Sequence, residues 1–200
     1  MPTHRHGHLA GLDEYLAEYD SYSIFDDVLA SETLWSFHAH PGRVITARLT
    51  GVETYDVTLT PPEGAAESLR KHDIHFLHPA EQAAAVEKLV KPDKAVQALG
   101  LEPAVFHRDR QFVKNKTLFP LLVERTVLFI TLRDGALIRG LITGFSRYDI
   151  HISMKGGVTV TLLRHSLHDI RDKDGRGYLK PVQEKRKDWK KSSLFVTPAE

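Results

Sequence analysis

The sequence contains no cysteine, only two methionines and two tryptophans, and no long run of apolar residues. The lack of cysteine excludes a disulfide scaffold and any zinc or iron–sulfur site with Cys ligands. No run approaches the ~20 apolar residues of a membrane-spanning helix, so we expect no membrane association. Residues 1–20 are polar and then acidic, unlike a secretory signal, and we expect a cytoplasmic protein.

The 200 residues are 42% hydrophobic and 26% charged, values that exclude wholesale disorder. The net charge is only +1, but it is unevenly distributed. Residues 1–34 hold seven acidic side chains against one arginine, whereas residues 180–191 hold six basic side chains against two acidic ones. This asymmetry indicates either a polyanionic partner or a solvated basic tail.

An internal repeat organises the chain. With an offset of 93 positions, residues 25–77 align with residues 118–170 without a gap, and twelve of the 53 pairs are identical. Chance would give roughly three. The identical pairs include Tyr55 with Tyr148, Asp56 with Asp149, and His72 with His165. The chain therefore contains two copies of one small unit.

Each copy is predicted to be a short helix followed by five strands. In the second copy the helix is expected within 114–125, and the strands at 126–133, 136–145, 147–153, 158–164 and 166–170. Asp134-Gly135 is a hairpin turn signal, and Gly140 inside a strand indicates a bend. So small a sheet must curl strongly or associate. Residues 78–100 have helical spacing, interrupted by Pro92.

The second copy resembles the Sm-like fold, and its Hfq branch in particular. The resemblance lies in TVLFITLRDGALIRGLITGFSRYDIHIS, a glycine turn and VTVTLLRHSLHDI, covering about 114–172. It extends more weakly to 25–77 through the repeat. It implies two Sm-like domains, each a short N-terminal helix plus a strongly bent five-stranded antiparallel sheet, joined by a helical linker. The expected segments are an N-terminal arm (1–24), a first domain (25–78), a linker (79–113), a second domain (114–172) and a basic tail (173–200).

The resemblance also implies a function. Hfq-type proteins form rings by strand addition and bind single-stranded RNA, with one face holding uridines at the pore. An aromatic residue stacks on each base, and a basic residue followed by His contacts base and backbone. By position, the implied RNA-binding residues are Tyr148, Arg147, Arg164, His165 and Lys114 in or beside the second copy, and Tyr55, Lys71 and His72 in the first.

The residues themselves agree with this function, because unpaired bases stack on aromatic rings and Arg, Lys and His donate to phosphates and base edges. The alternative is that both tyrosines belong to the core and the histidines merely end a strand. The chain departs from Hfq at two further sites. Thr131 and His38 replace the aromatic of the A-rich site, and of the rim arginines only Arg125 is present. Arg108, Arg110, Lys114 and Lys116 could substitute from the linker.

No phosphate loop or nucleophilic triad is present, so we expect neither an enzyme nor a cofactor. His4, His6 and His8 could chelate a metal only weakly, and the spacing of His72/His75 and of His165/His168 does not suit one strand face. Two functions stay open: an Hfq-related RNA chaperone in post-transcriptional regulation that binds U-rich RNA, or a diverged scaffold without RNA binding. Three chains would close a pseudo-hexameric ring; a hexamer of second copies is the rival.

Overall fold

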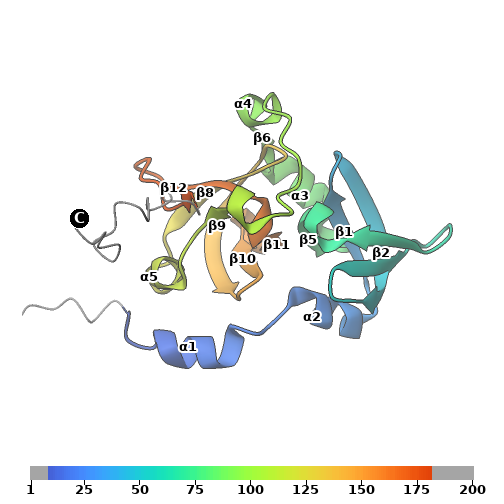
Figure 1. The fold of residues 1–200 in the computed structure, drawn as a ribbon, viewed down its shortest axis with the longest axis horizontal. Helices are drawn as coiled ribbons and strands as arrows, with labels where there is room; N and C mark the ends of the chain where they lie inside the picture. The colour runs from blue at the N-terminus through green and yellow to red at the C-terminus, as the bar shows by residue number, and fades with distance from the viewer. Residues whose placement is uncertain (1–8, 182–200) are drawn as a thin grey trace, which may run out of the picture.

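The chain is mainly β, with one large antiparallel sheet and a few short helices (Figure 1). The structure is a computed structural model and describes residues 9–181. His4, His6, His8 and most of the basic segment 180–191 lie outside the described residues. Within 9–181, no helix is long and apolar enough to cross a membrane. The predicted fold class is confirmed at this level of detail.

The sequence repeat is also a repeat of secondary structure. The first copy contains α2 (Ile24–Ser31), β1 (Leu34–Ala39), β2 (Arg43–Val52), β3 (Asp56–Thr60), β4 (Glu67–Arg70), η2 (Lys71–Asp73) and β5 (Ile74–Pro79). The second contains α5 (Asn115–Val123), β8 (Val127–Leu132), β9 (Ala136–Phe145), β10 (Asp149–Ser153), β11 (Thr159–Leu163), η6 (Arg164–Ser166) and β12 (Leu167–Asp172). When 93 is added to the residue numbers of the first copy, four of its five strands and its 3-10 turn η2 begin and end at the same residues as their counterparts in the second copy.

The remaining elements precede, connect or follow the two copies. They are α1 (Leu12–Tyr19), η3 (Ala80–Gln82), α3 (Ala83–Leu89), β6 (Lys91–Pro92), α4 (Lys94–Gln97), η4 (His107–Asp109), β7 (Gln111–Phe112), η5 (Lys155–Gly157) and β13 (Lys180–Pro181). The connector between the copies thus holds two short helices, with Pro92 between them. In Figure 1, α1 and α2 run along one side of the molecule, beneath the second and the first copy respectively.

The strands of both copies form one continuous sheet rather than two. Its order is β12-β8-β9-β10-β11-β5-β1-β2-β3-β4, and β6 pairs with β9. The halves meet where β11 pairs with β5, through Thr161 opposite Leu77 and Leu162 opposite Phe76. An isolated half would leave both of these strand edges unpaired, which favours their pairing. The sheet is open, with β4 and β12 at its two ends.

Each half has its own hydrophobic core, and the two cores interlock at the junction. The core of the second half surrounds Leu118, Ile130 and Ile150, and it includes Phe76 from the first half. The core of the first half in turn includes Leu163 from the second half. Because each half contributes a buried side chain to the other core, the junction is a packed interface as well as a strand pairing.

Gly140 permits a close approach of two strands at the bend of the second half. A Cβ atom at this position would lie 2.4 Å from Cγ2 of Ile152 and 2.6 Å from the carbonyl oxygen of Ser153. The pairing of β10 with β9 also shifts register between His151 and Ile152. Only glycine fits this position without displacing backbone, in agreement with the bend that the sequence indicates here.

Pro120 lies inside α5, and it neither starts nor ends the helix. The proline removes one backbone donor, which ordinarily breaks a helix. Leu118, Phe119 and Leu121, on either side of it, are all buried. Their packing offsets the lost hydrogen bond, so tertiary contacts override the local signal here.

Candidate nucleic-acid interface

A cavity of about 630 Å³ opens where the two halves of the sheet meet. Seven of the eight predicted site residues line it: Tyr55, Lys71, His72, Arg147, Tyr148, Arg164 and His165. Both copies therefore contribute to one shared cavity. Lys114 is exposed and is not among the lining residues; its backbone carbonyl accepts hydrogen bonds from Thr117 and Leu118 in the first turn of α5.

Both tyrosines are exposed at the cavity, so the alternative that they belong to the core is wrong. Tyr55 is 68% exposed and Tyr148 is 54% exposed. Each occupies a turn with the same backbone hydrogen bonds. Lys71 N donates to Tyr55 O at 2.8 Å, and Arg164 N donates to Tyr148 O at 2.9 Å. The two turns thus have the same backbone pairing between the tyrosine and the basic residue.

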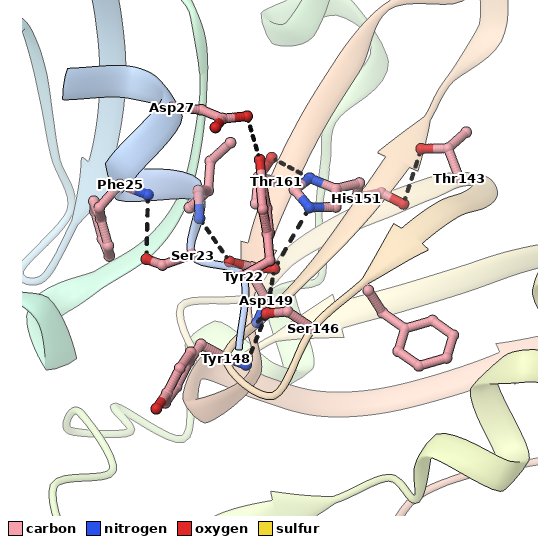
Figure 2. A network of polar contacts seen from close by, with 12 residues as sticks. Tyr22, Ser23, Phe25, Asp27, Thr143, Ser146, Tyr148, Asp149, His151 and Thr161 are labelled. Atoms are coloured by element: carbon pink, nitrogen blue, oxygen red, sulfur yellow. Dashed lines mark hydrogen bonds and ion pairs between the residues drawn. The ribbon is translucent and has the colours of Figure 1, made fainter. Parts of the chain in front are cut away.

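A buried polar network holds the turn that carries Tyr148 (Figure 2). Asp149 is fully buried; its carboxylate accepts from Ser146 Oγ at 2.7 Å and from Ile24 N, in α2 of the first copy, at 3.0 Å. Ser146 Oγ also accepts from Tyr148 N at 3.0 Å. His151 Nε2 lies 3.5 Å from the same carboxylate. Asp149 therefore caps the turn and ties it to the other half of the molecule.

We predict that Asp149→Ala destabilises the fold by about 2–4 kcal/mol, because two buried donors lose a charged acceptor. The repeat supplies a matched control. Asp56 is the counterpart of Asp149, and its carboxylate forms no hydrogen bond among the described residues. Asp56→Ala should change the free energy of unfolding by no more than about 0.5 kcal/mol. Urea denaturation measures both, and equal losses would contradict the prediction.

The four cations of the cavity differ in their partners. Arg147 forms an ion pair with Asp20, with Nη2 2.8 Å from Oδ2. The other three have neutral partners. Lys71 donates to the carbonyls of Glu53 and Thr54, and Arg164 donates to Asn115 Oδ1 at 2.9 Å. Arg110, from the connector, contacts the carbonyls of Ala104 and Val105.

Burial lowers the pKa of all three cations with neutral partners, that of Arg164 to about 10. The physical cause is the desolvation of a positive charge, which outweighs the more distant carboxylates. Of the described residues that line the cavity, Asp26 is the one acidic residue. The cavity therefore carries an excess of positive charge, and an anion placed there would be stabilised.

The two histidines of the site are held in place by hydrogen bonds. His165 Nε2 donates to the carbonyl of Ile74, in the first copy, at 2.9 Å. His72 Nε2 accepts from Arg110 Nη2 at 2.6 Å. The two rings lie 5.3 Å apart, centroid to centroid. Burial lowers the pKa of His165 to about 3 and also lowers the pKa of His72, so both rings are neutral near pH 7.

The fold contains further buried neutral histidines, which predicts acid lability. Desolvation lowers the pKa of His38 to about 3 and also lowers the pKa values of His75, His78 and His151. The unfolded chain takes up these protons near pH 6.5, whereas the folded chain takes them up only at lower pH, which for His38 is near pH 3. The free energy of unfolding is therefore highest above about pH 6.5 and falls as the pH drops below it; the loss that is due to His38 continues to about pH 3.

Urea titrations at a series of pH values test this prediction. Each buried histidine should contribute up to about 1.4 kcal/mol per pH unit to the loss. His38→Gln should flatten the pH dependence by up to one proton, whereas a Gln substitution at the exposed His107 should leave it unchanged. A free energy of unfolding that is constant from pH 7 to pH 5 would contradict it.

Sequence reasoning missed three residues of the site: Asp20, Arg110 as a cavity residue, and Asn115. Asp20 and Asn115 also contact each other, with Asn115 Nδ2 3.4 Å from Asp20 Oδ1. Asn115 directly follows Lys114, and its side chain is the one that accepts from Arg164. Arg110 had a signal, since it was one of four basic linker residues, but nothing in its spacing placed it beside His72.

Among residues 9–181, no group of three or more His, Asp or Glu side chains could hold a metal ion. The chain was also compared with known proteins. No protein-family model, curated protein or solved structure matches it.

Proposed function

We propose that the chain is an Hfq-related, tandem Sm-like protein that binds single-stranded RNA, preferably U-rich, in the cavity between its two halves. Two exposed tyrosines beside cations with neutral partners are the observation that carries this proposal. An aromatic ring offers a stacking platform for an unpaired base, and the excess positive charge attracts the phosphate backbone. The biological role that fits is RNA chaperoning in post-transcriptional regulation, without catalysis.

Direct binding tests the proposal. Fluorescence anisotropy with labelled oligouridylate, at low salt and then across a salt series, should show saturable binding whose affinity falls as salt rises. Oligoadenylate should bind more weakly. The ratio of absorbance at 260 and 280 nm after purification at low salt would report RNA that copurifies. No affinity for either oligomer at low salt would contradict the proposal.

The scaffold alternative also has an observation in its favour. Arg147 is neutralised by Asp20, and several large apolar side chains of the connector are exposed: Leu99, Val105, Phe106 and Phe112. Exposed apolar side chains that cluster along one segment are typical of protein-binding surfaces. If the chain binds no RNA, the connector is the surface on which to seek a protein partner.

We further propose that chains assemble head to tail, with three chains closing a pseudo-hexameric ring. The pairing of β11 with β5 supplies the template, because β4 and β12, at the ends of the sheet, are their counterparts. A hexamer of second copies alone would need the β11 edge, and in this chain β5 occupies that edge. The structure therefore favours the trimer over the rival hexamer.

A further inference from the structure

The connector between the two copies contributes one residue to the cavity. Arg110 is its one residue among those that line the cavity. Its guanidinium donates from Nε to the carbonyl of Ala104 at 3.0 Å and from Nη2 to the carbonyl of Val105 at 2.9 Å. The same Nη2 lies 2.6 Å from His72 Nε2. A residue from outside both copies thus contacts His72, one of the predicted RNA-contacting residues.

We propose that the connector is part of the RNA site and that Arg110 is its phosphate-binding residue, an inference that rests on the proposed function. Within residues 9–181, Arg110 binds no carboxylate, so its charge is available to an anionic ligand. Its three hydrogen bonds use Nε and Nη2, and Nη1 forms none within the described part of the chain. Two N–H donors therefore stay free for a phosphate oxygen.

Arg110 also sets the hydrogen-bonding state of His72. Because Nε2 of His72 accepts from the guanidinium, the proton of the neutral ring lies on Nδ1. Nδ1 forms no hydrogen bond in the described residues and can donate to a ligand. The free edge of the guanidinium and this imidazole N–H are two donors, on residues that line the cavity, that a ligand can engage.

Contacts to both halves hold the connector in this position. Arg133, in the turn between β8 and β9, donates to the carbonyl of Glu102 from Nε at 3.0 Å and from Nη2 at 2.8 Å, and from Nη1 to the carbonyl of Asp109 at 3.3 Å. From the first copy, His40 Nε2 lies 3.1 Å from a carboxylate oxygen of Glu102. Arg110 is therefore fixed before any ligand arrives, and binding need not order it.

Three full-length variants and labelled oligouridylate test the inference. Arg110→Gln removes the charge, Arg110→Lys keeps the charge without the planar fork, and Arg108→Gln is the matched control. Arg108 lies two residues away, is exposed beside Asp109, and does not line the cavity. Circular dichroism melts establish that each variant is folded. The measurement is the slope of log affinity against log salt concentration, which a purely structural role would not change.

Arg110→Gln should flatten the slope by about 0.7, the value for one phosphate contact on a single strand, and weaken binding several-fold. Arg110→Lys should keep the parental slope and bind more weakly, and Arg108→Gln should match the parent. If the parent binds RNA and Arg110→Gln has an unchanged slope, the inference is wrong while the proposed function stands. If the parent binds no RNA at low salt, both are wrong.

Discussion

Replacing Tyr148 with alanine should weaken the binding of oligouridylate by about 5- to 150-fold. The ring is half exposed at the cavity, so its loss removes about 1–3 kcal/mol of stacking for the base that it engages. Tyr148→Phe should bind almost as the parent does, because it keeps the stacking face. Tyr55→Ala should cost less, since Val52 and Thr54 replace Phe145 and Arg147 beside this ring. Anisotropy titrations measure all three.

A second substitution should remove a cation of the cavity without disturbing the fold. Arg164→Ala is a poor test, because this partly buried side chain bonds to Asn115 and lies over the ring of Phe145, so its removal would perturb the fold. Lys71→Gln is cleaner. Lys71 also lies over an aromatic ring, that of Phe25, but among the described residues its hydrogen bonds go to backbone carbonyls alone, whereas Arg164 bonds to a side chain. It should weaken binding and flatten the salt dependence. Folded Tyr148→Ala and Lys71→Gln proteins that bind as tightly as the parent would refute the assignment of the cavity.

The repeat was accessible to sequence reasoning because both copies keep their strand periodicity and turn residues. A hairpin depends on neighbouring residues, such as Asp134-Gly135, so its signal is local. The same holds for the tyrosine turns, where Tyr55-Asp56 and Tyr148-Asp149 are identical. These short-range patterns predict the strands, and they match the site residues of one copy with those of the other. The assignment of the halves to Sm-like domains is still a prediction.

The contacts that complete the site were not accessible in this way, because they join residues far apart in the chain. The ion pair of Arg147 with Asp20 and the contact of Arg110 with His72 depend on how the arm and the connector cross the junction. The hydrogen bond of His165 to the carbonyl of Ile74 likewise follows from the pairing of β11 with β5. A single sequence carries no local signal for such contacts, so it does not indicate that Arg164 bonds to Asn115 or that His165 bonds to the first copy.

The open ends of the sheet give the second large expected effect. An offset of 93 relates Thr161 to Ser68 and Leu77 to Ile170, so the internal junction predicts that Ser68 of one chain pairs with Ile170 of the next. This register places Glu67 directly opposite Arg171, with both side chains on one face of the extended sheet. Repetition of one such heterologous contact closes a ring when the rotation allows it.

In the single chain, one of these two edges is already covered. The segment after β12 folds back, so that Tyr178 N donates to the carbonyl of Ile170 at 2.9 Å and Tyr178 Oη donates to Asp172 at 2.7 Å. A bridge also joins Arg171 and Gly177. At the internal junction Leu77, the counterpart of Ile170, pairs with β11. For Ile170 to pair with a second chain in the same way, that chain must displace the segment that follows β12. Tyr178→Ala should therefore promote assembly.

Because the chain has no cysteine, a designed disulfide can report this contact without background. Glu67→Cys combined with Arg171→Cys should yield a covalent ladder on mild oxidation that ends at three chains, since directly opposed Cβ atoms lie about 4.5–5.5 Å apart. The two positions lie at opposite ends of one sheet, so a bond within a single chain is excluded. Glu67→Cys with Asp172→Cys shifts the register by one residue, turns the side chains to opposite faces, and should cross-link poorly. Tyr178→Ala should increase the yield of the first pair. Equal cross-linking by both pairs, or none by either in folded protein, would contradict assembly through these edges, and a ladder that continues to six chains would contradict closure at three.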